Sequence, residues 1–399
     1  MNIAIYTLTS ELHDANAVKD ATREFLNNLE IEYTLKGNDF SDYGQCPLCL
    51  IYVRTGGTEG VFKRLLPELL KKSSQPFLLL ASGKSNSLPA SMEILSFLRG
   101  QGIGGEIIHG KPEYVRRRIL QLQHVSEARR QLRGMRLGVI GKPSDWLIAS
   151  HADHDAVRRK LGIELVDIDM QELLDGCDGC EDKCSGPGCE GAIERGYEKS
   201  LPGAEIIYHA LKGLVEEHRL QGLTLRCFDL LSAVKNTGCL ALARLNAEGI
   251  VGSCEGDVPA MLTMAIAQAL TGLTGFQANP ACIDTENGEM VLAHCTIPLN
   301  MVERYELTTH FESGIGVGIR GFMKEGAVTI FKVSGDLSHY FIAEGQLIRN
   351  EAKPDLCRTQ QVIRLDDKSQ TAYFLNNPIG NHHIIIPGHH RELLEEFLK

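Results

Sequence analysis

Residues 134–144 read GMRLGVIGKPS, and this stretch decides how the chain is divided. Residues 135–140 form a short apolar run of the kind that makes a buried strand, and the Gly-Lys-Pro-Ser that follows is a turn. A basic helical stretch, residues 114–133, comes directly before it. A fresh strand after a helix indicates that a second α/β unit begins near residue 134.

The residues before this stretch alternate between strand-like and helical patterns. Apolar runs at residues 3–6, 48–53 and 77–80 are separated by segments with apolar residues at helical spacing, such as residues 61–72. Alternating strands and helices predict a parallel sheet with helices on its faces. Residues 1–133 are therefore expected to form an N-terminal α/β domain.

The residues after it first continue the α/β pattern and then change. Further strands are expected at residues 163–168, 223–228 and 249–253, which gives a second α/β domain over residues 134–273. Beyond that point short β-rich runs punctuated by Gly and Asn replace the long helices, as in an antiparallel sheet or small barrel. The predicted fold class is α/β, with two α/β domains followed by a β-rich C-terminal domain, residues 274–399.

Composition excludes two classes of partner and predicts a location. The 399 residues contain 41 Lys and Arg against 51 Asp and Glu, a net charge of −10, which argues against nucleic acid and anionic membranes as partners. No apolar run approaches the roughly 20 residues that span a bilayer. The first residues, MNIAIYTLTS, lack the pattern of a secretory signal, so a cytoplasmic location is expected.

Three segments of the second half carry candidate chemistry. In SCEGDVPA, residues 253–260, a β-run ends and a helix begins, with Asp257 as the expected N-cap and Glu255 at the carboxyl edge of the sheet, where such sheets place ligands. Asn287-Gly288 predicts a hairpin with Asp284 on one arm and His294 on the other. In NPIGNHH, residues 377–383, a turn delivers His382 and His383 into a strand, where only one of them can face a shared site.

Two carboxylates and a neutral imidazole are a plausible ligand set for Mn²⁺ or Mg²⁺. An incomplete protein shell leaves positions for substrate oxygens, and a metal there stabilises an enediolate. A carboxylate with a tuned pKa can move the proton between two carbons.

Long motifs in these same regions resemble the L-fucose isomerase-like family, whose fold is shared with L-arabinose isomerase. The resemblance covers nearly the whole chain. It implies two Rossmann-like domains, a β-rich C-terminal domain and the activity of a metal-dependent aldose–ketose isomerase. The motifs are YVRTGGTE, LLASGKSNSLPASMEILSFLR, RLGVIGKPSDWLI, LRCFDLL, SCEGDVPA, LAHCTIP, THFESGIGVGIRG and NPIGNHH.

The resemblance also implies a ligand set, usually for Mn²⁺. Matched motif by motif, Glu255 and Asp284 fall on the two carboxylate ligands, which also act as the proton-transfer groups. His382 falls on the histidine ligand, although His383 remains possible by register. His294 resembles an additional histidine ligand of the arabinose enzyme, and His294 and His383 are both expected to line the substrate site.

Substrate and assembly expectations come from the same source. Family members are trimers or hexamers whose active sites borrow residues from a neighbour, and Lys84 and Asn86 resemble that contribution. The chain is much shorter than the long fucose isomerases, which puts L-fucose itself in doubt. Lys84 or Arg226 would suit an acidic or sulfonated hexose such as sulfoquinovose, although either can simply pair with a protein carboxylate.

A dense cysteine cluster supports a competing interpretation. It could hold Zn²⁺ or an Fe–S cluster, form disulfides, or consist of free thiols. A regulatory protein centred on it is one alternative to an enzyme. A non-catalytic sugar sensor is another alternative. A nicotinamide oxidoreductase is a third, but the sequence lacks the glycine fingerprint that such enzymes use to bind the dinucleotide. The cluster consists of Cys177, Cys180, Cys184 and Cys189.

Overall fold

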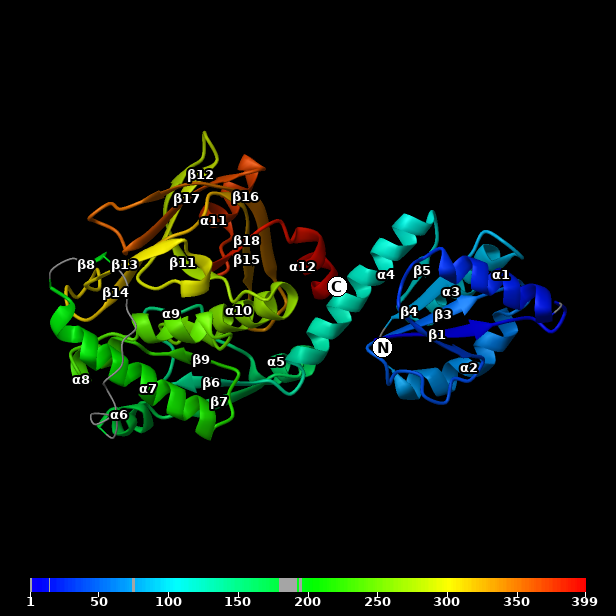
Figure 1. Cartoon of the computed structure of the whole chain (residues 1–399), viewed down its shortest axis with the longest axis horizontal. Helices are drawn as coiled ribbons and strands as arrows, with labels where there is room; N and C mark the ends of the chain where they lie inside the picture. Colours follow the sequence, from blue (N-terminus) through cyan, green and yellow to red (C-terminus); the bar gives the residue numbers. More distant parts are fainter. Residues whose placement is uncertain (1, 14, 74–75, 179–191, 194–195) are drawn as a thin grey trace. The chain divides into compact units, whose positions relative to one another are not determined.

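The computed structural model describes residues 2–13, 15–73, 76–178, 192–193 and 196–399. These residues form two compact units, Met1–Arg130 and Gln131–Lys399, here called unit 1 and unit 2. Unit 2 contains a parallel sheet and the β-rich region together (Figure 1). The division into three domains, with a boundary at residue 273, stays a prediction.

Unit 1 is a five-stranded parallel sheet with the strand order β2-β1-β3-β4-β5. Its strands are buried apolar runs such as FLLLA in β4, as expected for a sheet covered on both faces. The order reverses beside β1, which is the arrangement of doubly wound α/β folds. The elements are β1 (Ile3–Leu8), α1 (Ala15–Asn27), β2 (Thr34–Gly37), β3 (Leu48–Val53), α2 (Glu59–Lys72), β4 (Phe77–Ala81), α3 (Ser87–Gly100) and β5 (Gly105–Ile108), followed by α4 (Pro112–Leu132) at the junction with unit 2.

Unit 2 begins with a second parallel sheet, of order β10-β9-β6-β7. The two parallel sheets confirm the α/β part of the expected fold class. The strands are β6 (Arg136–Ile140), β7 (Glu164–Ile168), β9 (Gly222–Leu225) and β10 (Val251–Cys254). The helices are α5 (His154–Leu161), α6 (Met170–Asp178), α7 (Leu201–Glu217), α8 (Phe228–Ala233), α9 (Cys239–Ala247) and α10 (Val258–Thr271).

The C-terminal part of unit 2 is a closed six-stranded barrel, which confirms the β-rich region. Its strands run in the order β11-β12-β17-β16-β15-β18, and every pair is antiparallel. The strands are β11 (Phe276–Asp284), β12 (Glu289–His294), β15 (Gly326–Val333), β16 (Tyr340–Glu351), β17 (Thr359–Leu365) and β18 (His383–Pro387). Beside it lie a small sheet of β14 (Gly318–Phe322), β13 (Arg304–Thr308) and β8 (Ala192–Ile193), and the helices α11 (Thr371–Asn376) and α12 (Arg391–Leu398).

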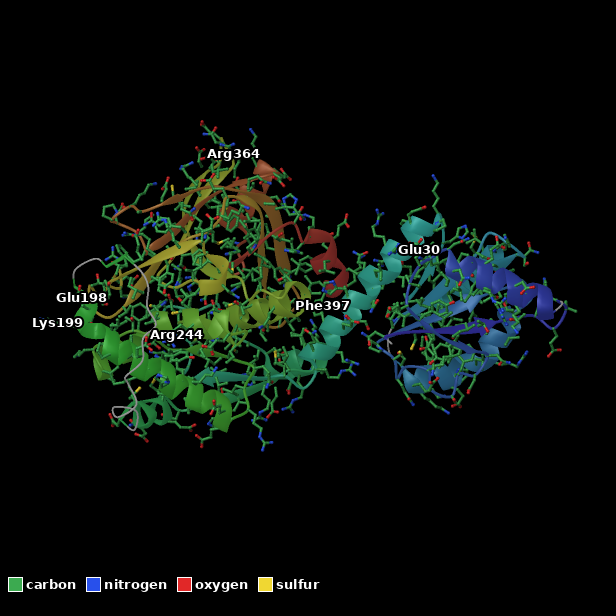
Figure 2. The ribbon with its side chains drawn as sticks, in the orientation of Figure 1. Glu30, Glu198, Lys199, Arg244, Arg364 and Phe397 are labelled. Carbon is green, nitrogen blue, oxygen red and sulfur yellow. The ribbon has the colours of Figure 1, made fainter. Side chains whose placement is uncertain are left out.

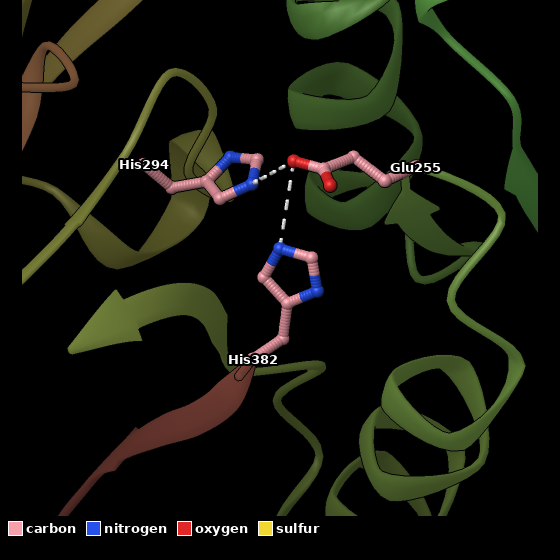
Figure 3. A group of neighbouring side chains, drawn as sticks. All are labelled: Glu255, His294 and His382. Carbon is pink, nitrogen blue, oxygen red and sulfur yellow. Dashed lines mark ion pairs between the residues drawn. The ribbon is translucent and has the colours of Figure 1, made fainter. Parts of the chain in front are cut away.

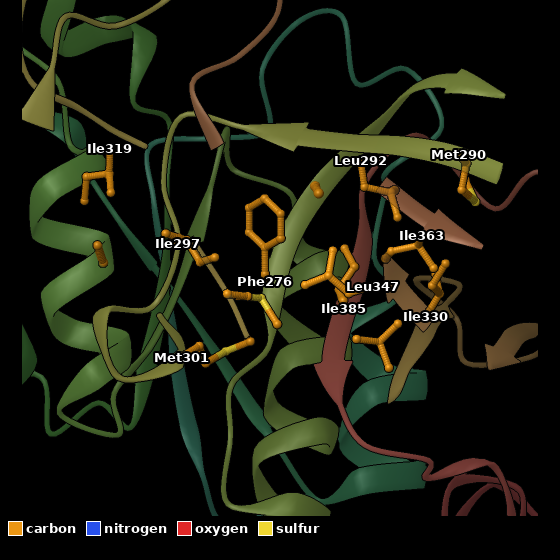
Figure 4. Close-up of a cluster of buried hydrophobic side chains, with 14 of the residues drawn as sticks. Phe276, Met290, Leu292, Ile297, Met301, Ile319, Ile330, Leu347, Ile363 and Ile385 are labelled. Carbon is orange, nitrogen blue, oxygen red and sulfur yellow. The ribbon is translucent and has the colours of Figure 1, made fainter. Parts of the chain in front are cut away.

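The barrel interior is filled by apolar side chains that alternate along its strands. Phe276, Leu292 and Ile385 come from three neighbouring strands and point into one cluster (Figure 4). Helix α10 lies between this barrel and the parallel sheet and contacts β10, β15 and β18 (Figure 1). Residues at the start of α10 are therefore held by the parallel sheet on one side and by the barrel on the other.

Charged side chains cover the outside of unit 2. Arg364 extends from the barrel surface toward Glu289, and Arg244 on α9 lies 3.8 Å from the ring centroid of Tyr208 (Figure 2). No helix in the described part of the chain is both long enough and apolar enough to cross a bilayer.

Candidate metal site

Glu255 sits in a strained turn between β10 and α10. Its φ is +64°, and that of Gly256 is +69°, so two successive residues adopt the left-handed conformation. A Cβ on Gly256 would lie 2.5 Å from the carbonyl oxygen of Lys142, so the close approach of the two loops requires glycine. Left-handed backbone at a non-glycine residue is costly and is often found at functional sites. The turn thus places Glu255 between the end of β10 and the start of α10.

Asp257 begins that helix, as the sequence predicts. Its Oδ1 accepts a hydrogen bond of 2.8 Å from the backbone N–H of Ala260, which is the expected N-cap contact. Its Oδ2 lies 2.8 Å from Nδ1 of His382. The same carboxylate thus caps α10 and contacts a histidine of the barrel.

The two barrel histidines come together because β11 pairs with both of their strands. Asn279 of β11 pairs with Ala293, and the adjacent Ala278 pairs with His383. His294 ends β12 and His382 directly precedes β18, so both reach the same rim of the barrel. Their rings meet edge to face, with centroids 5.4 Å apart.

Glu255, His294 and His382 converge on one point (Figure 3). Oε1 of Glu255 lies 3.6 Å from Nε2 of His294 and 3.5 Å from Nε2 of His382. All three residues are buried, and Nε2 of His382 has no hydrogen-bond partner in the described part of the chain.

These separations are longer than good hydrogen bonds and suit a shared ion. Bonds of about 2.1 Å from nitrogen or oxygen to a metal place neighbouring ligand atoms roughly 3.0–3.4 Å apart. An unsatisfied buried nitrogen beside a carboxylate oxygen is costly unless a cation completes the site. The three residues therefore fit a divalent metal.

The pKa values of Glu255, His294 and His382 depend on the contacts between these three side chains. Burial alone would raise the pKa of Glu255, but the facing His382 and His294 hold that pKa well below its usual range. Burial lowers the pKa of His294, whereas the carboxylates of Glu255 and Asp257 outweigh burial at His382 and raise its pKa to about 9. In the absence of a metal, the carboxylate charge of Glu255 is thus balanced by a charged His382.

A lysine completes the network behind His382. Nζ of Lys332, on β15, lies 3.7 Å from Oδ1 of Asp257, and both side chains are fully buried. Burial lowers the pKa of Lys332, and Asp257 opposes this effect. The order Lys332, Asp257, His382 resembles the arrangement in which a carboxylate orients a metal-binding imidazole through its far nitrogen.

Aromatic side chains lie beside the carboxylate. Nε1 of Trp146 donates a 2.7 Å hydrogen bond to Oε2 of Glu255. The Trp146 ring contacts the Phe228 ring edge to face, with centroids 4.7 Å apart. The Phe228 ring in turn contacts the His310 ring, with centroids 5.6 Å apart. Burial lowers the pKa of His310 to about 4, so this imidazole is neutral near pH 7. Trp146 is 51% exposed and is a surface on which a sugar ring can pack.

No role was predicted for Trp146, His310 or Lys332. Trp146 follows β6 at the carboxyl edge of the second sheet, and it is the single tryptophan of the chain, so its position was a usable signal. Lys332 sits in a strand, where a lysine ordinarily indicates a solvated face.

The prediction that Asp284 is a metal ligand is wrong. Its carboxylate is exposed at the β11–β12 turn, where it accepts hydrogen bonds from Asn287 and from the backbone N–H of Glu286. Asp284 pairs with Glu289, whereas the rim carrying His294 lies beside Asn279. Asp284 is five residues beyond Asn279 on the same strand. At about 3.4 Å per residue, the two positions lie about 17 Å apart.

His383 and Arg226 are engaged elsewhere. The ring of His383 is buried against Phe374 and lies 3.0 Å from the hydroxyl of Tyr373, and burial lowers its pKa to about 3. Of the adjacent pair, His382 is the one that faces Glu255. Arg226 forms ion pairs with Asp145 and Asp229, so it braces the loop that carries Trp146. Its contact with an anionic sugar stays a prediction.

The remaining predicted residues lie outside this group. Lys84 and Asn86 belong to unit 1, where Lys84 pairs with Glu24 and Asn86 precedes α3. Cys177 is buried at the end of α6. The rest of the cysteine cluster, Cys180, Cys184 and Cys189, lies outside the described residues, and nothing supports Zn²⁺ or an Fe–S cluster there.

A second group of ligand-type side chains lies on the barrel surface. Glu344, Asp366 and His389 are as close to one another as the buried group, but Asp366 and His389 are exposed. Exposed acidic groups of this kind are common without an ion.

Comparison with known proteins identifies relatives among sugar isomerases. The chain is 25% identical over 268 residues to a sulfoquinovose isomerase of Priestia megaterium, which covers 62% of this chain and 59% of the relative. It is 23% identical over 262 residues to one of Alkalicoccus urumqiensis, with the same coverage. A third, from Clostridium sp. MSTE9, is 25% identical over 241 residues, 57% of this chain and 54% of the relative. The matches thus span less than two thirds of the relatives' length, and no protein-family model matches the chain.

Proposed function

We propose that this protein is a divalent-metal-dependent aldose–ketose isomerase acting on a sulfonated hexose such as sulfoquinovose. The convergence of Glu255, His294 and His382 on one point is the observation that carries the proposal. The similarity to sulfoquinovose isomerases supports the reaction and the substrate class. The resemblance to the L-fucose isomerase-like family supports the same reaction type.

Glu255, His294 and His382 would hold the metal, and Mn²⁺ is the ion we assign. One carboxylate and two imidazoles suit a hard-to-intermediate cation and leave positions open for two substrate oxygens. When bound, the metal would supply a Lewis acid that makes the hydrogen on the carbon beside the carbonyl more acidic.

The protein groups then move and hold protons. Isomerisation removes a proton from C2 of the aldose and returns it to C1, while the O2 hydroxyl proton passes to O1. Oε1 of Glu255 faces both histidines, so we assign Glu255 this transfer between carbons. Asp257 keeps the Nδ1 proton of His382 in place, so that Nε2 faces the site. The Trp146 indole fixes the other oxygen of Glu255 and offers its face to the sugar.

A panel of neutral and sulfonated aldoses with added Mn²⁺, followed by NMR in D₂O, tests this proposal. We expect ketose formation from the sulfonated hexose, deuterium at C1 or C2, and loss of turnover on addition of EDTA. Glu255→Gln should abolish turnover, whereas His389→Gln, on the exposed control group, should leave it at the wild-type rate. Sugar binding without any ketose would instead identify a non-catalytic sugar sensor.

The assembly expected from the family resemblance also stays a proposal. We propose a homo-oligomer, a trimer or hexamer, in which Lys84 and Asn86 of a neighbouring chain contact the far end of the sugar. Light scattering on the purified protein measures the number of chains directly. A monomer at micromolar concentration would contradict this assembly.

A further inference from the structure

His310 lies beside the candidate metal site without belonging to its ligand group. It follows β13 by two residues, in a loop that is closed by a 3.1 Å hydrogen bond from its backbone N–H to the carbonyl of Ile315. The backbone N–H of Phe311, the next residue, is hydrogen-bonded to the thiol of Cys295, which directly follows His294. The segments that carry His294 and His310 are therefore neighbours.

Aromatic rings and charges connect His310 with Glu255. The His310 ring contacts the Phe228 ring, which contacts the ring of Trp146, whose indole N–H is hydrogen-bonded to Glu255. Burial is the main cause that lowers the pKa of His310 to about 4. The charge of His294 lowers this pKa further, and the charge of Glu255 opposes the effect. Because such charge effects fade over roughly 10 Å, the His310 ring lies close to both ligands.

The contacts of Nδ1 determine which nitrogen of His310 carries the proton. The backbone N–H of Ser313 donates a hydrogen bond of 3.4 Å to Nδ1, and the Ser313 hydroxyl lies 3.0 Å from the same atom. Nδ1 is the acceptor, because a backbone N–H can only donate. A neutral imidazole has one donor and one acceptor nitrogen, so the proton of the neutral His310 ring is on Nε2.

The Nε2 atom of His310 is open. His310 is only 8% exposed, yet its Nε2 has no hydrogen-bond partner in the described part of the chain. Unlike Nε2 of His382, this atom is not sealed from solvent. A polar atom in such a buried ring ordinarily finds a partner in the protein, in water or in a ligand. His310 is thus held at Nδ1 and offers an N–H donor at Nε2.

We propose that the Nε2–H group of His310 donates a hydrogen bond to O1 of the open-chain sugar. Negative charge develops on this oxygen as the proton leaves C2, and a fixed donor stabilises that charge more than it stabilises the bound substrate. A neutral imidazole does this without placing a further positive charge beside the metal ligands. The inference rests on the proposed function and adds a second protein group, besides Glu255, that contacts the reacting atoms.

Turnover of His310→Leu and His310→Gln, each loaded with Mn²⁺, tests this contact. Leucine fills the space without a donor, whereas the amide nitrogen of glutamine can take the place of Nε2. We expect kcat to fall about 100-fold or more in His310→Leu, as for the loss of one oxyanion donor, and to stay within about tenfold of wild type in His310→Gln. The Mn²⁺ affinity of both variants should equal the wild-type value, because neither loses a ligand.

His218→Gln is the control for the loss of a histidine elsewhere in unit 2. His218 pairs with Glu172 on α6 and, in the described part of the chain, contacts no residue of the site. This variant should keep the wild-type kcat. A wild-type kcat in His310→Leu, or an equal loss in His310→Leu and His310→Gln, would overturn the proposal.

Binding of a glucitol that carries a sulfonate at C6 separates this inference from the proposed function. The glucitol keeps O1 as a hydroxyl but cannot isomerise, so calorimetry in the presence of Mn²⁺ measures the contact without turnover. His310→Leu should bind it roughly tenfold more weakly than wild type, and His310→Gln nearly as tightly as wild type. A wild type that binds the glucitol but forms no ketose would contradict the proposed function, and the affinities would still decide the contact. Equal affinity of His310→Leu and wild type would overturn it.

Discussion

At the scale of single residues, Asp257 joins two parts of unit 2. One oxygen caps α10 and the other faces Nδ1 of His382, while Lys332 balances the charge from the far side. Removing a carboxylate that orients a metal-binding histidine ordinarily weakens metal binding by one to two orders of magnitude. A substitution of Asp257 that keeps the helix cap but removes the charge therefore tests its role in orienting His382 by itself.

Asp257→Asn should retain the helix cap but weaken Mn²⁺ binding roughly 10–100-fold, because asparagine caps helices well but carries no charge. A competition titration against a metal-sensitive dye measures this affinity. Asp153→Asn is the matched control, since Asp153 caps α5 through Ala156 N–H at 2.9 Å and contacts no site residue. Equal Mn²⁺ affinity of Asp257→Asn and wild type would contradict the assigned role.

Asp284→Asn tests whether Asp284 is a metal ligand. Because Asp284 lies in the hairpin turn and bonds to Asn287, its neutral counterpart should bind Mn²⁺ with wild-type affinity. Glu255→Gln, measured in the same titration, should bind at least 100-fold more weakly, since a charged ligand is lost. A large loss of affinity in Asp284→Asn would restore it as a ligand.

At the scale of elements, the site depends on the turn between β10 and α10. Glu255 reaches the barrel histidines because the backbone turns through two left-handed residues before the helix begins. Gly256 lies against the loop after β6, with no room for a side chain. The turn therefore couples the position of Glu255 to the packing of two loops of the second sheet.

Gly256→Ala should displace Glu255 and weaken Mn²⁺ binding at least tenfold, because its Cβ would lie 2.5 Å from the Lys142 carbonyl oxygen. Gly272→Ala is the matched control. Gly272 also has a positive φ, +77°, at the end of α10, but its added Cβ meets nothing within 4 Å. Gly272→Ala should lose about 1 kcal/mol of unfolding free energy by urea denaturation, and Gly256→Ala should lose more because its Cβ also clashes. Only Gly256→Ala should lose metal affinity. Loss of affinity in both would assign the effect to global destabilisation.

At the scale of the whole molecule, features that depend on local sequence patterns were predicted better than contacts between residues far apart in the sequence. The two parallel sheets and the β-rich region followed from periodicity, whereas the ligand roles of Glu255 and His382 were expected from the family resemblance. Asp284 was misplaced because an aspartate after an apolar run also suits a turn, where it bonds to its own backbone. Lys332 reaches Asp257 across a long stretch of sequence, and no local pattern encodes such a contact.

The single tryptophan makes the emission of the whole protein a report on the site. Because the Trp146 indole donates to Glu255, Mn²⁺ binding should change its fluorescence in a saturable way. A titration of wild type and Glu255→Gln measures this, and the variant should show only weak collisional quenching. Wild-type emission that stays constant while metal binds would place the ion away from Trp146.

The number of Mn²⁺ ions bound per chain tests the central claim most directly. Equilibrium dialysis followed by elemental analysis should give one ion per wild-type chain. Glu255→Gln, His294→Gln and His382→Gln should each retain almost none at the same free Mn²⁺ concentration, whereas His389→Gln should retain one. A wild-type chain without metal, or full occupancy after loss of any of the three buried ligands, would contradict the account.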